Sequence, residues 1–168
     1  KELLSKANTK ADLAKIQQEL NESEMSDKND IRLMIAEKIL SDLTRKIPEL
    51  STVTDADRLS GDILAEMNSF KDIYQTQIEQ ALSSINDKKR ALFQAMIDKS
   101  SSKDDIRRID RDIDASVDFP AKSTIKVALS DKIVLLFSQA LQGAISITDA
   151  DYIEKEAAIA LEPYKNLK

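Results

Sequence analysis

Helix-breaking residues are scarce in this chain, which has two glycines and three prolines among 168 residues. Because proline and glycine are the residues least compatible with a helix interior, their scarcity leaves long segments free to be helical. Aromatic residues make up only 4% of the chain, so its core must be built from aliphatic side chains. Aliphatic residues on a helical period are typical of helices packed on helices. The sequence therefore predicts an all-α bundle.

Apolar residues recur at steps of three and four along most of the chain, and each such stretch predicts a helix. The predicted helices span residues 2–20, 26–47, 54–99 with one break, 102–118, 123–142 and 148–164. Thr9, three residues before Asp12, marks an alternative start for the first of them. We expect one bundle domain of six or seven helices over residues 1–168. Because the chain begins at Lys1 without Met, we expect that it was cut from a longer precursor.

The strongest apolar stripe lies in residues 54–99 and would form a helix about 67 Å long if unbroken, longer than a compact domain of this size. Either the domain is elongated or the helix is interrupted. Residues 83–87 contain two serines, an asparagine and an aspartate, which are poor formers of a helix interior. We therefore expect the helix to break within residues 83–87.

Two further segments differ in how much of their surface is apolar. Residues 123–142 carry apolar side chains around most of the helix, which predicts the buried centre of the bundle, closed by Gly143 in a left-handed conformation. Residues 102–118 carry a single stripe, formed by Ile106, Ile109, Ile113 and Val117. One narrow stripe indicates a helix that packs along one side and exposes the rest to water.

The tetrapeptide Thr-Asp-Ala-Asp occurs at residues 54–57 and again at residues 148–151. The flanking patterns do not match over a longer window, so a duplicated domain is not favoured. Threonine with a following acid satisfies the free amides at a helix start, and the acids interact favourably with the helix dipole. The repeat therefore predicts two helix starts of the same kind.

The chain lacks the residues on which most catalytic and metal sites depend. It has no histidine and no cysteine, so the usual nitrogen and sulfur metal ligands and the common nucleophile–base pairs are missing. Gly61 and Gly143 are isolated, so the chain has no glycine-rich phosphate loop. We therefore expect no enzymatic activity and no cofactor.

One acidic run has calcium-loop spacing, formed by Asp110, Asp112, Asp114 and Asp118. The loop glycine and the bidentate glutamate of such a site are replaced by Ala115 and Ala121. The isoleucine stripe places the acids on a helix, where residues two apart point in different directions. We expect a solvated helix face and no metal.

Charge and hydropathy restrict the partners. A net charge of −5 argues against a role in nucleic-acid binding, which needs clustered cations. No continuous apolar run approaches the roughly 20 residues of a membrane-spanning helix. We therefore expect a protein partner for a chain that is itself a monomer.

Two basic clusters are candidates for the partner-binding surface. Arginine is enriched where proteins bind one another, and the first cluster lies on the singly anchored helix of residues 102–118. It consists of Arg107, Arg108 and Arg111, and the second cluster consists of Lys88, Lys89 and Arg90. The alternative for the arginines is an exposed face with local pairs, such as Asp104 with Arg108 and Arg108 with Asp112.

These features favour a non-enzymatic protein-binding domain. In being helical, free of cysteine and histidine, and apparently excised, the chain resembles the helical ectodomains of spirochaetal lipoproteins. That resemblance implies an extracellular or cell-surface bacterial protein that engages host proteins in virulence. The alternative is a cytoplasmic structural component, of a coiled coil or a secretion apparatus, in which the stripe from Leu59 to Ile85 packs on another copy. The two classes differ in whether that stripe is buried within the chain.

Overall fold

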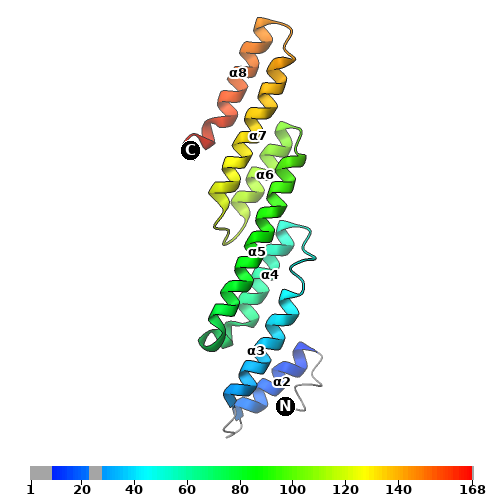
Figure 1. The fold of residues 1–168 in the computed structure, drawn as a ribbon, viewed down its shortest axis with the longest axis vertical. Helices are drawn as coiled ribbons and strands as arrows, with labels where there is room; N and C mark the ends of the chain where they lie inside the picture. Colours follow the sequence, from blue (N-terminus) through cyan, green and yellow to red (C-terminus); the bar gives the residue numbers. More distant parts are fainter. Residues whose placement is uncertain (1–8, 23–27, 168) are drawn as a thin grey trace. The chain divides into compact units, whose positions relative to one another are not determined.

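The computed structural model describes residues 9–22 and 28–167, and over these ranges the chain is helical with no strand. The seven α-helices are α2 (Lys10–Glu22), α3 (Lys28–Thr44), α4 (Val53–Glu66), α5 (Lys71–Lys99), α6 (Lys103–Ala115), α7 (Lys122–Gln142) and α8 (Ile147–Leu161). Two short 3₁₀ turns, η1 (Asn68–Phe70) and η2 (Glu162–Tyr164), follow α4 and α8 (Figure 1). The all-α prediction is confirmed.

The helices group into two compact units. Unit 1 comprises Lys1–Glu49 and Arg58–Ile85, and unit 2 comprises Leu50–Asp57 and Asn86–Lys168. Helices α4 and α5 each contribute residues to both units. That residues 1–168 unfold as a single domain stays a prediction.

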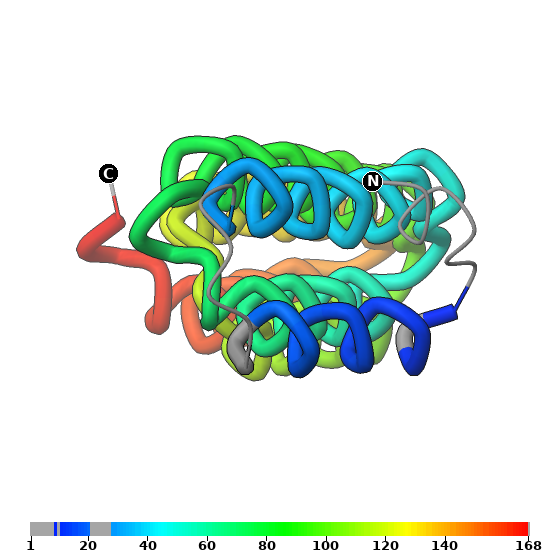
Figure 2. The backbone as a smooth tube through the Cα atoms, turned by 90° about the horizontal axis from the view of Figure 1, so that it is seen from below, coloured from blue at the N-terminus to red at the C-terminus, as the bar shows by residue number. Residues whose placement is uncertain are grey.

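Unit 1 begins with α2, which lies alongside α3 (Figure 2). Thr9 and Asp12 cap α2 reciprocally, because each side chain accepts the backbone N–H of the other, at 3.2 Å and 2.9 Å. The alternative helix start at Thr9 is therefore correct, and residues 2–8 of the predicted first helix lie outside the described residues. Arg32 of α3 donates to the Ser69 carbonyl at 2.9 Å and forms an ion pair with Asp72 at 3.1 Å. These contacts join α3 to the start of α5.

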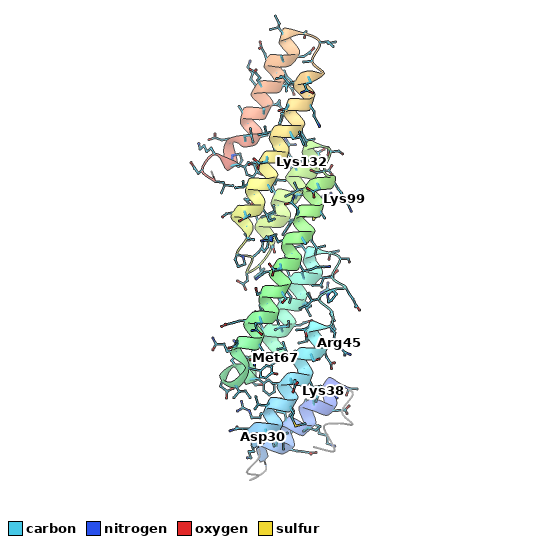
Figure 3. The ribbon with its side chains drawn as sticks, viewed as in Figure 1. Asp30, Lys38, Arg45, Met67, Lys99 and Lys132 are labelled. Atoms are coloured by element: carbon cyan, nitrogen blue, oxygen red, sulfur yellow. The ribbon has the colours of Figure 1, made fainter. Side chains whose placement is uncertain are left out.

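The predicted helix of residues 54–99 is interrupted, but not where expected. Helix α4 ends at Glu66, η1 follows, and α5 begins at Lys71 with a kink at Tyr74. The break expected within residues 83–87 was wrong, because α5 runs through them: the Ser84 hydroxyl donates to the Gln80 carbonyl and Ile85 is fully buried. Met67, labelled in Figure 3, and Phe70 are also fully buried. The apolar stripe therefore continues across the interruption, and the interruption cannot be recognised from the apolar pattern of the sequence.

The repeated tetrapeptide lies at helix starts, as expected, but its threonines are not the capping residues. Helix α4 is capped by Thr52, whose hydroxyl accepts the Asp55 N–H at 3.1 Å. Helix α8 is capped in the same way by Ser146, which accepts the Asp149 N–H at 3.1 Å. Helices α4 and α8 therefore begin before Thr54 and Thr148. The predicted capping residues lie two positions after the actual ones.

Helix α7 is not the most buried helix. Its buried side chains all come before Val134 and are Ile125, Leu129, Ser130 and Ile133. Beyond them Val134, Leu135 and Leu141 are exposed, whereas Leu136 and Phe137 are half-buried and pack against the core cluster of unit 2. Gly143 ends α7 with φ −90°, so the left-handed cap was also wrong.

Helix α6 packs along one side, as the single stripe predicts. Ile106, Ile109 and Ile113 are buried, and Ser102 caps the helix by accepting the Asp105 N–H at 3.1 Å. Val117 was wrongly placed on the stripe. Because α6 ends at Ala115 and Ser116 is extended, the Val117 side chain is exposed.

Substitutions in the two halves of α7 should separate their roles. Leu129 is fully buried, so Leu129→Ala should lower the free energy of unfolding by about 2–5 kcal/mol through lost burial and a residual cavity. Leu141 is 39% exposed, and Leu141→Ala should cost about 1 kcal/mol or less. Urea denaturation of both variants measures the difference. Equal losses would contradict the burial pattern of α7.

Candidate functional site

Unit 2 contains a groove of about 540 Å³ between α6, α7 and α8. This volume lies within the range of sites that hold small molecules or a few side chains of a partner. Helical spacing builds its apolar walls, because residues three and four apart share a face. Helix α7 contributes Ile133, Leu136, Phe137 and Ala140; α8 and η2 contribute Tyr152, Ile153, Ile159, Ala160, Pro163 and Tyr164; α6 contributes Ile106.

The apolar lining continues out of the groove onto the surface of α8. Tyr152 is 62% exposed and Ile159 is 70% exposed, although both border the groove. Large apolar side chains exposed next to a concave apolar wall are typical of surfaces that bind another molecule. The groove is therefore the best candidate for a functional site in unit 2.

A salt bridge crosses the groove between α6 and α8. The Lys103 ammonium donates to the Glu156 carboxylate at 2.8 Å and lies 4.9 Å from the centre of the Phe137 ring. The hydrogen bond from Lys103, the positive charge of Lys103 and, to a smaller extent, that of Arg107 lower the pKa of Glu156. Lys103 thereby places a charge pair beside an otherwise apolar wall.

A second polar cluster holds η2 against α6. Burial and the neighbouring Asp110 carboxylate, to which its hydroxyl is hydrogen-bonded, raise the pKa of Tyr164 well above its ordinary value. The Lys126 ammonium lies 3.4 Å from Asp110 Oδ1 and 2.6 Å from Asp114 Oδ1. Burial alone would lower the pKa of Lys126, but the two carboxylates outweigh it and raise that pKa. The cluster thus keeps Tyr164 protonated and in place at the groove.

Of the predicted arginine cluster, only Arg107 lines this groove. Arg107 and Arg111, with Asp104 and Asp110, also line a second, shallow hollow, whereas Arg108 lines neither. All three arginines are exposed. The local pairs are those of Arg107 with Asp104, at 3.5 Å, and Arg108 with Asp105, at 3.4 Å. These pairs, spaced three residues apart, replace the expected pairs of Arg108 with Asp104 and Asp112.

The predicted second basic cluster does not form one surface. Lys89 is 1% exposed: its ammonium pairs with Asp57 of α4 at 2.5 Å and donates to the Val117 carbonyl at 3.0 Å. Its assignment to a partner-binding patch was therefore wrong. Lys88 is half-buried and Arg90 is exposed. A signal was present in the sequence, because Lys89 lies one helical turn from both Ile85 and Phe93 and so falls on the apolar stripe.

The α8 wall of the groove was missed in the sequence. Its residues Tyr152, Glu156 and Ile159 recur at steps of four and three, followed four residues later by Pro163 of η2, and they flank the half-buried Ile153 and Ala157. A second, narrower stripe beside the main one was the available signal.

Searches for similar proteins found no family, curated protein or solved structure that matches the chain. Within residues 9–22 and 28–167, no helix is long and apolar enough to cross a membrane. The same described ranges contain no group of three acidic side chains arranged to hold a metal ion. Within the acidic run, Asp110 and Asp114 form ion pairs with Lys126 of α7.

The Lys103–Glu156 bridge should depend on pH in a defined direction. Because the pKa of Glu156 is lowered from its ordinary value of 4.5, the bridge contributes fully above pH 4.5 and is lost as the pH falls through the lowered pKa. A carboxyl NMR titration should therefore give Glu156 a midpoint below 4.5. Lys103→Met should raise that midpoint toward 4.5, and an unchanged midpoint in this variant would contradict the bridge.

Removing Lys89 should destabilise unit 2 strongly. Lys89→Ala leaves Asp57 partly buried without its ammonium partner and removes packing, so it should lower the free energy of unfolding by about 2–4 kcal/mol. Arg90→Ala, at the neighbouring exposed position, should change it by about 0.5 kcal/mol or less. Thermal denaturation compares the two variants. If both had the same small effect, the buried position of Lys89 would be refuted.

Proposed function

We propose that this chain is a non-enzymatic protein-binding domain that uses the groove between α6, α7 and α8. The exposed Tyr152 and Ile159 beside this groove are the observation that carries the proposal. A partner side chain seated in the groove would also cover these two residues. Tyrosine and arginine, represented here by Tyr152 and Arg107, are enriched among the residues that dominate binding energy between proteins.

Burial of the long apolar stripe supports this class over self-assembly. The stripe residues that would have to face another copy are inside unit 1 and include Leu59, Ile63, Ile78 and Ile85, each 4% exposed or less. A coiled-coil component would leave such a stripe available for a second chain. The proposed role is therefore that of a monomeric binding domain.

We further propose that the partner is a host protein and that the chain belongs to a bacterial surface or secreted protein. Sequence character supports this location: a helical chain without cysteine or histidine. Immunolabelling of intact cells tests it directly, because a cytoplasmic protein would be labelled only after permeabilisation.

The groove is tested by photo-crosslinking from position 159 to proteins of host serum, followed by affinity measurements on the identified partner. Ile159→Asp and Arg107→Glu should each weaken binding about tenfold or more, because both residues line the groove. Arg108→Glu is the matched control, since it lies on the same helix with its own acidic neighbour but outside the groove. Loss of affinity in the control alone, or in none of the variants, would contradict the proposed site.

A further inference from the structure

The repeated tetrapeptide is the end of a longer repeat of six residues, and unit 2 contains both copies of this hexapeptide. Residues 52–57 read Thr-Val-Thr-Asp-Ala-Asp and residues 146–151 read Ser-Ile-Thr-Asp-Ala-Asp. The two copies make the same cap: the first hydroxyl donates to the fourth-residue carboxylate at 2.6 Å and accepts that residue's N–H at 3.1 Å in both. Val53 and Ile147 therefore hold equivalent positions, as do Asp57 and Asp151.

The first copy is covered by another helix. Asp57 pairs with the buried Lys89 of α5, and Val53 packs against a core cluster that includes Phe93. Lys89 and Phe93 are four residues apart and so lie on the same face of α5. The helix that covers the first copy thus presents a lysine to the aspartate and contributes, one turn later, a large apolar residue to the cluster against which the aliphatic side chain packs.

The second copy has no such cover in unit 2. Ile147 is 82% exposed, and Asp151 is exposed and forms no ion pair with any described residue. Helix α8 packs on α7 through a different face, on which Ala150, Ile153 and Ala157 are half-buried. Ile147 and Asp151 also do not line the groove between α6, α7 and α8. The face formed by Ile147 and Asp151 is therefore separate from the proposed binding groove.

We propose that this face of α8 docks a helix of a protein partner that presents a lysine and, one turn later, a large apolar side chain. The first copy indicates what would bind the second. It has the same helix cap, an aspartate at the same position and an aliphatic residue at the same position, and it already binds a helix of this kind within the chain. Asp151 gives charge complementarity to the lysine, while Glu154 and Lys155, each one turn from Asp151, carry opposite charges that offset one another. A second copy of this chain does not offer its own α5 for this role, since Lys89 and Phe93 are buried.

The test uses a probe taken from α5 itself. A peptide of residues 82–99, stapled through positions 87 and 91, which are exposed in α5, is held helical and carries a photoreactive benzoylphenylalanine in place of Phe93. We expect it to crosslink to the start of α8 at residues 147–151. Asp151→Asn or Ile147→Ala in the protein should weaken binding about tenfold, as should Lys89→Gln in the peptide.

Two controls separate this surface from the others. Asp112→Asn removes an exposed acid of α6 and should leave peptide binding unchanged, which excludes a general charge effect. Arg107→Glu should also leave peptide binding unchanged, because Arg107 belongs to the groove. The proposal for the groove and the proposal for this face of α8 can therefore be refuted independently.

Three results would overturn the proposal. Crosslinks to residues 53–57 would mean that the peptide only exchanges with α5 at the first copy. Unaltered binding to Asp151→Asn would remove the charge argument. A concentration-dependent dimer, observed by sedimentation and abolished by Ile147→Asp, would assign the face to a second copy of the chain.

Discussion

The buried ammonium of Lys89 is the interaction on which unit 2 most depends. A buried charge is tolerated only when it is paired and hydrogen-bonded, and Lys89 obtains its acceptors from Asp57 and from the Val117 carbonyl. Ser116 also donates to Asp57, at 3.2 Å. One side chain of α5 thus fixes the first turns of α4 and the segment that follows α6. The position of α6, and with it one wall of the groove, follows from that arrangement.

The C-terminal end of α6 is therefore anchored by polar contacts, and at its N-terminal end Lys103 forms an ion pair with Glu156 of α8. A core cluster that includes Phe93, Phe119 and Tyr164 lies between these two ends, and the rings of Phe93 and Phe119 are 5.4 Å apart. The Lys132 ammonium, labelled in Figure 3, adds a contact from α7 to the Asp98 carbonyl at the end of α5, at 3.1 Å. These contacts hold α5, α6 and α7 together, and further along α7 the Lys103 ammonium of α6 lies over the Phe137 ring.

Local features of the fold were predictable from the sequence, and features set by tertiary contacts were not. The Ser102 cap and the stripe of Ile106, Ile109 and Ile113 depend on residues close in sequence, and both were predicted correctly. The interruption between Glu66 and Lys71 was missed because the apolar stripe remains buried through it, with Met67 and Phe70 fully buried. In the candidate site, Arg107, which was selected by its residue type, lines the groove, whereas identifying the α8 wall required knowledge of which helices meet. Lys89 was wrongly assigned to a basic surface cluster on the basis of its charge, although its position on the apolar stripe indicates a buried side chain.

The same reasoning explains why α7 was expected at the centre of the bundle. An apolar surface shows that a helix has something to bury, but it does not identify what buries it. Burying one large aliphatic side chain contributes about 1.5–3 kcal/mol, so leaving Leu135, Ile147 and Ile159 exposed forgoes stabilisation that the buried isoleucines of α6 provide. Exposed aliphatics of this kind gather on the α7–α8 hairpin, where the groove and the second hexapeptide copy also lie. A hairpin with more apolar surface than its own fold covers would gain burial by association, and this is the physical argument for placing both proposed binding surfaces on this part of unit 2.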